Sequence, residues 1–336
     1  MKAALRRITE GKDLTRDEAA KVMEILLSGE ATQAQIGALL TAMRMKGETL
    51  EELIGFVSVL ARKAEHISPK VDKYIDIVGT GGDGMSTFNI STTSAFVIAG
   101  AGVAVAKHGN RAISSKSGAG DVLEALGVNI AAEPAVVQKC VEDCGIGFMF
   151  AQKFNPSMRF VGQARQEMGI RTAFNILGPL ANPSQAKYMI IGVYDPKLTE
   201  VIANVMLQLG IQRGMIVSDD NGMDEISMTA DTRVSEIKNG EVITYKITPE
   251  QFGFQRAFPA DVAGGTGAEN AEITKNILRG EKGPKRDCVL LNAGSALYVT
   301  GAAKSIEEGI RLAAESIDSG KAMQVLTKLQ AESNNA

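Results

Sequence analysis

The fold is decided by a stretch that runs Tyr74-Ile75-Asp76-Ile77-Val78-Gly79-Thr80-Gly81-Gly82-Asp83-Gly84. Its first five residues are β-prone, and the glycines end the strand in a tight turn. Asn89–Gly100 then predicts a helix, Val103–Ala106 the next strand and Asp121–Leu126 the next helix. Because strands alternate with helices across short glycine-rich turns, the pattern indicates a mainly parallel sheet with helices on its faces.

This alternation continues toward the carboxyl end. Strands are predicted at Ile146–Phe150, Tyr188–Val193 and Gly214–Ser218, and helices at Pro156–Gly169, Phe174–Leu177, Lys197–Leu209, Asn292–Thr300, Ser305–Ser319 and Lys321–Gln330. Two β-prone runs flank Asn239-Gly240, the strongest short hairpin signal, and add an antiparallel element. The fold class is therefore α/β.

The first 66 residues differ, because they are helical throughout. Thr15 and Thr32 stand in capping patterns at the starts of two of these helices. Each helix carries one apolar stripe, and short helices cannot bury all of it against one another. We expect the surplus to form a homodimer interface; packing on the chain's own α/β domain is the alternative. The expected division is a helical, dimerising domain of residues 1–69 with roughly 165–185 folding back, and an α/β domain of residues 70–164 and 186–336.

Composition excludes several classes of protein. The 336 residues are 45% hydrophobic and 22% charged, which is a globular composition. The net charge of −3 predicts neither a nucleic-acid nor a membrane partner. No uninterrupted apolar run reaches the roughly 18–20 residues of a spanning helix, and we expect Met1-Lys2-Ala3 to begin a charged amphipathic segment and not a signal peptide. Three cysteines argue against a disulfide framework, so we expect a cytoplasmic protein.

The glycine-rich turn suits an anion. Glycines let backbone N–H groups approach a phosphate, and Asn89-Ile90-Ser91-Thr92 opens a helix whose positive end favours one. The turn matches neither the dinucleotide fingerprint nor the ATP-type phosphate loop. By itself it is equally consistent with a merely tight connection.

A second loop repeats this design after the next strand. Lys107-His108-Gly109-Asn110-Arg111 is followed by Ser114-Ser115-Lys116-Ser117-Gly118 and another helix start. Cations, hydroxyls and glycines coincide here, and ligands of open parallel sheets bind beyond the carboxyl ends of the strands. We therefore predict a polyanion site; a solvated basic loop is the alternative. His108 is not interpreted as an acid or base.

Two further segments complete the candidate site. Asp224-Glu225 lies in the acidic loop after Gly214–Ser218, and adjacent carboxylates there suit Mg²⁺ shared with a substrate phosphate. Beside a polyanion site, this interpretation outweighs that of a polar turn. Arg165 could bind a carboxylate through its guanidinium, although composition alone indicates that it is a charged residue on the surface.

In this order and spacing, the segments resemble the anthranilate phosphoribosyltransferase family, which has the nucleoside phosphorylase-like phosphoribosyltransferase fold. The matching runs are Gly79–Asp83, Asn89–Thr92, Lys107–Arg111 with Ser114–Gly118, Arg171–Leu180 and Gly222–Ile226. The resemblance spans essentially the whole chain. It implies a small helical dimerising domain, a larger α/β domain, and transfer of a phosphoribosyl group from 5-phosphoribosyl 1-diphosphate to anthranilate in tryptophan biosynthesis.

The resemblance also implies the roles of individual residues. The diphosphate donor would contact Gly79, Gly82, Asp83, Thr87, Asn89, Ile90, Ser91, Thr92, Lys107, His108, Gly109, Asn110, Arg111, Ser114, Ser115 and Ala119. Anthranilate would contact Gly79, Asn110 and Arg165. Two Mg²⁺ per subunit would be held by Ser91, Asp224 and Glu225. No residue is assigned as a catalytic acid or base, because the aromatic amine is already neutral and positioning can replace a strong base.

Two departures from the family pattern concern the acceptor. Asn155-Pro156 stands where the family often has a histidine before the proline, and Gln163-Ala164-Arg165 replaces a Pro-Val-Arg run. They put the affinity for anthranilate in question and leave the donor and metal residues intact. The alternative functions are a pyrimidine nucleoside phosphorylase-like enzyme, which has little need of Asp224-Glu225 with Mg²⁺, and a non-catalytic nucleic-acid-binding relative, which should carry a basic surplus.

Overall fold

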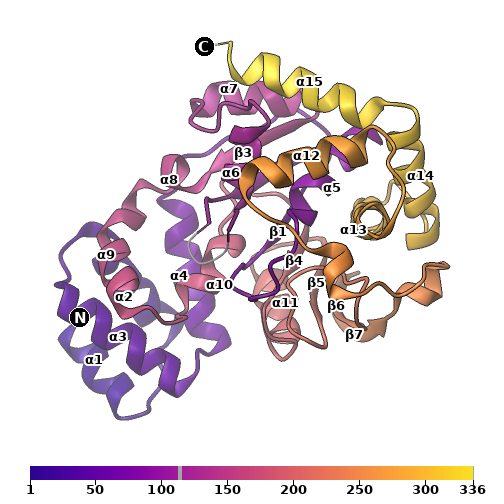
Figure 1. The fold of residues 1–336 in the computed structure, drawn as a ribbon. Helices are drawn as coiled ribbons and strands as arrows, with labels where there is room; N and C mark the ends of the chain where they lie inside the picture. Colours follow the sequence, from indigo (N-terminus) through magenta and orange to yellow (C-terminus); the bar gives the residue numbers. More distant parts are fainter. Residues whose placement is uncertain (113–115, 336) are drawn as a thin grey trace.

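The computed structural model describes residues 1–112 and 116–335, and it has a helical domain beside an α/β domain built on one sheet (Figure 1). The strand order is β3-β2-β1-β4-β5-β6-β7. The strands are β1 (Tyr74–Gly79), β2 (Ala104–Gly109), β3 (Ile146–Phe150), β4 (Tyr188–Gly192), β5 (Arg213–Asp219), β6 (Thr232–Lys238) and β7 (Glu241–Ile247). The first five are parallel, and β6 and β7 form an antiparallel hairpin through Asn239-Gly240. The predicted α/β class and the predicted hairpin are confirmed.

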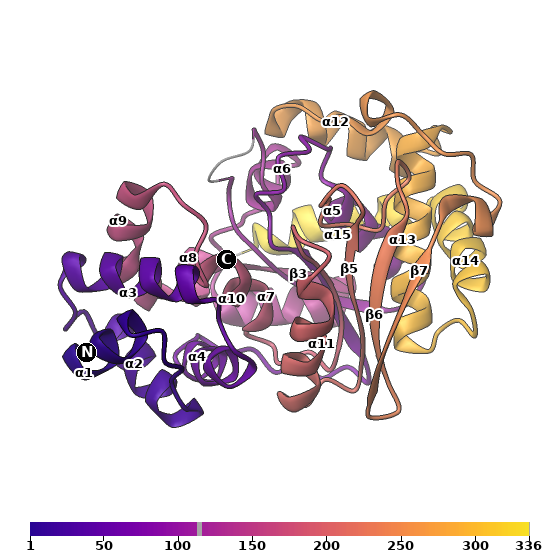
Figure 2. The same ribbon diagram turned by 90° about the horizontal axis from the view of Figure 1, so that it is seen from below.

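Alternate side chains of the central strands face two different cores. On β4, Ile190 joins the core with Phe96 and Val289, whereas Met189 and Ile191 join the core of the helical domain. The helices of the α/β domain are α5 (Ile90–Gly100), α6 (Ala119–Ala125), α7 (Pro134–Lys139), α11 (Leu198–Gln208), α12 (Gly267–Leu278), α13 (Pro284–Thr300), α14 (Ile306–Asp318) and α15 (Lys321–Ser333). α11 packs between the sheet and α4, so one face of the sheet is continuous with the helical domain (Figure 2).

The helical domain is formed by α1 (Lys2–Thr9), α2 (Arg16–Ser28), α3 (Gln33–Lys46), α4 (Leu50–Arg62), α9 (Arg159–Met168) and α10 (Phe174–Leu180), with the short α8 (Ala151–Phe154) as the link from the sheet. Thr15 and Thr32 cap α2 and α3 in complete capping boxes, as predicted. Part of the apolar surplus of these helices is buried on the chain's own sheet and α11.

Several expected boundaries were wrong. α9 packs on α2 and α3 from Arg159 onward, and the backbone N–H of Ala164 donates to the Gln33 side chain (3.0 Å), so 159–164 lie with the helical domain and not with the α/β domain. α13 begins at Pro284, eight residues before the predicted Asn292. α12 was not predicted, although Thr266 and Glu269 have the spacing of a capping box, which the structure shows to be complete.

Membrane-spanning helices are absent from the described part of the chain, since none of its helices is both long and apolar enough. Cys140, Cys144 and Cys288 are buried and free. Cys140–Cys144 forms a π-helical turn after α7 rather than an α-helix.

Candidate active site

The candidate site begins where the chain changes direction across the sheet. From β1 the chain moves outward to β2 and β3, then returns to place β4 on the other side of β1. Ligands bind at such a switch point, outside the carboxyl ends of the strands. β1 and β4 end in the paired residues Gly79 and Gly192, and Asp224 lies directly on this pair. A Cβ on Gly79 would meet Asp224 Oδ2 at 2.4 Å, and one on Gly192 would meet the Asp224 carbonyl oxygen at 1.6 Å. Only glycines leave room for Asp224.

The loop after β1, residues 79–84, has the conformation that its glycines predict. Gly81 and Gly82 have φ of 66° and 72°, in the left-handed region that favours glycine. The Gly81 N–H donates to Asp224 Oδ2 at 2.6 Å, and the Gly82 carbonyl accepts from the Arg171 guanidinium. In this state the loop is fixed to an acidic side chain by a backbone donor.

Three carboxylates form what we call the carboxylate cluster: Asp83, Asp224 and Glu225. Burial raises the pKa of Asp224 to about 7, and the neighbouring Asp83 carboxylate adds to the shift. Burial and then Asp224 raise the pKa of Glu225 to about 8, against the opposing charge of Lys107. Crowded carboxylates that resist ionisation are suited to a divalent cation, which removes their repulsion.

The cluster does not enclose a metal by itself. Among the described residues, no group of three or more His, Cys, Asp and Glu side chains is arranged to hold one. The residues therefore fit Mg²⁺ that takes its other ligands from water or a substrate phosphate, the usual pattern for this ion. Ser91 lies at this place too: its N–H donates to Glu225 Oε1 (3.1 Å), and its hydroxyl accepts from Lys107 Nζ (3.3 Å).

The start of α5 is less open than expected. The Ser91 N–H is already bound to Glu225, and Asn89 accepts from Ser117 (3.2 Å) and Asn270 (2.8 Å) through its side-chain oxygen. The hydroxyls of Thr80 and Thr92 are buried and have no hydrogen-bond partner among the described residues. Thr87 forms an isolated bridge with Ala263, which ties the loop before α5 to the segment before α12.

The second predicted loop, Lys107–Arg111, splits into two parts. Lys107 is buried and donates to the Ile77 carbonyl, with Nζ near the carboxylate cluster. Arg111 instead forms ion pairs with Glu124 (2.8 Å) and Asp121 (3.2 Å) of α6, so its guanidinium is engaged. Ala119 begins α6 and lies close to Gly109. The predicted Ser114 and Ser115 lie outside the described residues.

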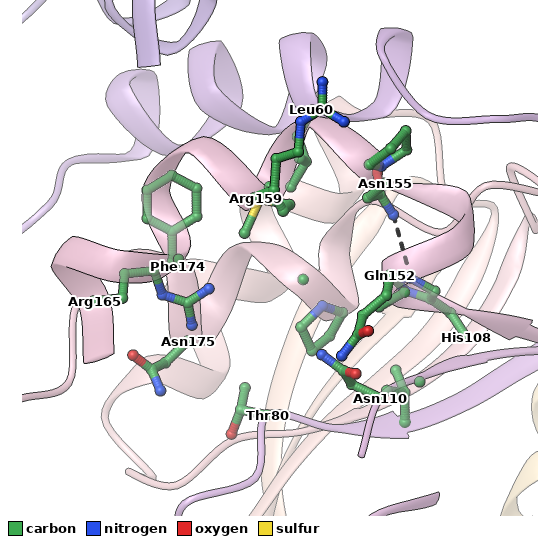
Figure 3. A pocket seen from close by; sticks show the side chains of 18 of the residues that line it. Leu60, Thr80, His108, Asn110, Gln152, Asn155, Arg159, Arg165, Phe174 and Asn175 are labelled. Atoms are coloured by element: carbon green, nitrogen blue, oxygen red, sulfur yellow. Dashed lines mark hydrogen bonds between the residues drawn. The ribbon is translucent and has the colours of Figure 1, made fainter. Parts of the chain in front are cut away.

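A cavity of 590 Å³ opens between the ends of β1 and β2 and the helices α4, α9 and α10 (Figure 3). Gly79, Asn110 and Arg165 all line it. Arg165 forms no ion pair or side-chain hydrogen bond with any described residue, and its guanidinium lies over the Phe174 ring at 5.3 Å. Burial lowers the pKa of Arg165. An unpaired cation in a mostly apolar cavity suits an aromatic anion.

The cavity also contains groups that sequence reasoning missed or left without a role. His108 lines it; burial lowers the pKa of His108 to about 4, so the ring is neutral near pH 7. Asn155 donates toward His108 Nε2 at 3.4 Å, and within the described part of the chain its side-chain oxygen has no partner. Pro179 lines the cavity too, whereas the nearby Phe154 is fully buried in a core and does not line it.

Three residues of the site were not predicted from the sequence. They are Gly192, which leaves room for Asp224, and the buried Asp76 and Asn182 beneath the Lys107 loop. Gly192 ends a predicted strand, but nothing in the sequence showed that Asp224 would pack on it. Asp76 was visible as a carboxylate inside a β-prone run, a signal that sequence reasoning did not use.

Comparison with known proteins gives one consistent result. Residues 71–323 match the family described as "Glycosyl transferase family, a/b domain", and residues 2–64 match "Glycosyl transferase family, helical bundle domain". Among curated relatives, anthranilate phosphoribosyltransferase of Acetivibrio thermocellus is 55% identical over 97% of this chain and 94% of its own length. That of Symbiobacterium thermophilum is 49% identical over 98% and 97%.

Solved structures agree with the sequence relatives. The anthranilate phosphoribosyltransferase of Thermus thermophilus superposes with a TM-score of 0.93 at 40% identity, over 98% of this chain and 99% of its own. The Saccharomyces cerevisiae enzyme, solved in complex with PRPP and Mg, gives 0.92 at 28% identity, over 99% and 98%. The chain therefore belongs to the anthranilate phosphoribosyltransferase family.

Proposed function

We propose that this protein transfers the 5-phosphoribosyl group from 5-phosphoribosyl 1-diphosphate to the amine of anthranilate, releasing pyrophosphate, as a step of tryptophan biosynthesis. The observation that carries the proposal is the unpaired Arg165 guanidinium over Phe174, in a cavity that shares Gly79 with the loop holding the carboxylate cluster. A site for an aromatic carboxylate thus adjoins a site for a metal and a polyanion. The curated relatives carry the name of this reaction.

The donor is assigned to the loops on the sheet. Backbone N–H groups of residues 79–84, the start of α5 and the buried Lys107 ammonium would neutralise the diphosphate, and the two Mg²⁺ assigned here would be held by Ser91, Asp224 and Glu225. Bound Mg²⁺ supplies positive charge to the departing diphosphate. In this assignment Asp224 and Glu225 orient the donor, and Gly79 and Gly192 leave the space in which Asp224 lies.

The acceptor is assigned to the cavity. Arg165 would bind the carboxylate of anthranilate, the Phe174 side would contact its ring, and Asn110 would lie beside its amine. The amine is weakly basic and neutral at pH 7, so its lone pair is free to attack C1. His108 cannot serve as a cationic acid near neutral pH, because its pKa is lowered to about 4. Rate enhancement then comes from orientation and charge neutralisation, without a strong general base.

Assembly and location complete the proposal. We infer that the helical domain forms a homodimer; Met45 on α3 and Ile170 after α9 are exposed apolar residues, 83% and 42% accessible, that such an interface could cover. We further infer a cytoplasmic location, because the three cysteines are buried and free.

One assay tests the reaction. Purified protein is mixed with anthranilate, 5-phosphoribosyl 1-diphosphate and Mg²⁺, and anthranilate fluorescence is followed; the chain has no tryptophan, so the protein background is small. The expected result is a decay that needs all three components and stops with EDTA. Release of free base from a pyrimidine nucleoside and inorganic phosphate, with no decay in the anthranilate mixture, would favour a phosphorylase. Absence of both reactions, with salt-sensitive binding of a DNA oligomer, would favour the nucleic-acid-binding alternative.

A further inference from the structure

The hydrogen-bonded ladder between β1 and β2 stops early, directly beneath the site, and leaves a gap in the pairing of the sheet. These strands pair only at Tyr74 with Ala104 and at Ile75 with Val105. Each nevertheless continues to pair with its other neighbour: β1 with β4 as far as Gly79, and β2 with β3 as far as Gly109. Backbone groups along the gap must therefore find partners other than the facing strand, because they are buried.

Side chains supply those partners. Asp76 Oδ1 accepts from the His108 N–H at 3.2 Å, and Asp76 Oδ2 accepts from Asn182 Nδ2 at 2.6 Å. Asn182 Nδ2 also donates to the Ala106 carbonyl at 3.0 Å. Ser184 donates to Asn182 Oδ1 through its N–H (2.8 Å) and hydroxyl (2.6 Å), which fixes the amide with its nitrogen toward the gap. Asp76 and Asn182 are buried, with 0% and 5% exposure.

We propose that the Asp76–Asn182 pair is a positioning device for the Lys107 loop: it holds the carboxyl-terminal half of β2 apart from β1 and so sets the place of that loop in the site. The kinetic part of this proposal rests on the proposed function. The structural part does not.

The chemistry of the pair is specific. The side chain at position 76 must supply two acceptor atoms, one for the His108 N–H and one for Asn182. Only a carboxylate provides both in that volume. An asparagine at position 76 would turn an N–H toward one of the two donors. The gap itself matters because its two sides, Val78–Thr80 and His108–Asn110, both line the cavity. Closing or loosening it would move one side of the site relative to the other.

Two variants, Asp76→Asn and Asn182→Ala, test the pair by hydrogen–deuterium exchange and by kinetics. We expect faster amide exchange in peptides covering 104–112 and unchanged exchange in 79–84, because β1 keeps its partner β4. Without bound substrate, the Lys107 loop of each variant would occupy the position that binds the diphosphate donor only part of the time. The KM for the donor should therefore rise about tenfold or more, and kcat should stay within about threefold of wild type.

Tyr74→Phe is the matched control. It removes the hydrogen bond from the Tyr74 hydroxyl to the Ser184 carbonyl (2.7 Å), which holds the same 182–184 segment but spans no part of the gap. It should change neither the exchange of 104–112 nor the donor KM. Thermal melting of each variant separates loss of fold from loss of position.

Hydrogen–deuterium exchange of the wild-type protein also tests the proposal, without any substitution. Its His108 amide should exchange as slowly as a ladder amide of β2, although its acceptor is a side chain. Rapid exchange there, unchanged exchange in both variants, or the same loosening in Tyr74→Phe would overturn the proposal. Absence of transferase activity would reject the proposed function alone, since the exchange results stand without it.

Discussion

The two sides of the site are built in opposite ways. On the sheet side, the carboxylate cluster and Lys107 are crowded together and form hydrogen bonds with backbone groups of β1, of the loop after it and of α5. On the helical side, Arg165 lies in an apolar cavity without a polar partner among the described residues. The sheet side is thus organised by charge before any ligand arrives, whereas the helical side leaves one charge for the ligand to neutralise. Changes on the sheet side should therefore affect metal binding and turnover, and changes on the helical side should affect acceptor affinity.

The strongest test of this contrast removes the acidic pair. Asp224→Asn with Glu225→Gln should abolish Mg²⁺ dependence and lower turnover by about a thousandfold or more, because the charge that orients metal and diphosphate is lost. Turnover against Mg²⁺ concentration measures this. Asp220→Asn is the matched control, since Asp220 lies in the same loop but pairs with Lys246 on the surface. A fully active double variant would remove the metal site from the proposal.

A smaller effect is expected from a substitution of Gly192, the glycine against which Asp224 packs. Gly192→Ala places a Cβ 1.6 Å from the Asp224 carbonyl oxygen, so the loop must shift, and turnover should fall about a hundredfold. Gly37→Ala on α3 is the control, because its Cβ would meet only Met168 Sδ at 3.8 Å. Mg²⁺ titration by calorimetry should show weaker binding for Gly192→Ala. Normal binding with normal turnover would show that the position of Asp224 is not critical.

On the helical side, Arg165→Ala should raise the KM for anthranilate by roughly 10- to 100-fold, the value of one hydrogen-bonded charge contact, with a smaller change in kcat. Arg159→Ala is the comparison, since Arg159 lines the same cavity but stacks on Phe160. Initial rates at saturating donor measure both. Equal effects of the two substitutions would mean that the cavity responds to net charge and not to Arg165 in particular.

The smallest effect concerns pH. The folded-state pKa values of Asp224 and Glu225 are raised, to about 7 and about 8, so their protonated forms favour folding. That contribution is fully present below the unfolded-state values near 4 and is lost as the pH rises through 7 and 8. Mg²⁺ binds the ionised forms, so the rise in Tm that it causes should grow between pH 6 and pH 8.5. Thermal melts with and without Mg²⁺ measure this, and the rise should be absent at every pH in the double variant, because that variant has lost the metal site. A pH-independent rise in wild type would contradict the assignment.

Local patterns predicted much of this protein. The alternation of β-prone runs and helices, the hairpin at Asn239-Gly240 and the caps at Thr15 and Thr32 depend on residues close in the chain. The boundary of the folded-back segment was wrong because α9 joins the helical domain through contacts such as Gln33 with Ala164, 131 residues apart. Arg111 also shows the limit, since its basic character predicted an anion site but Glu124 and Asp121 occupy the guanidinium.

The sequence by itself determined the class of fold and the order of its chemical groups: glycine loop, basic loop, arginine and acidic pair, each placed by a strand end or a helix start. Only the tertiary structure decided how these groups meet. Asp224 reaches Gly81 across 143 residues, and Asn182 reaches Asp76 across 106. Such contacts depend on which strands are neighbours and on how closely their backbones approach. Local secondary-structure propensity predicts neither of these. The tertiary structure therefore determines three features: the packing of Asp224 on Gly192, the gap between β1 and β2, and the cavity between the domains.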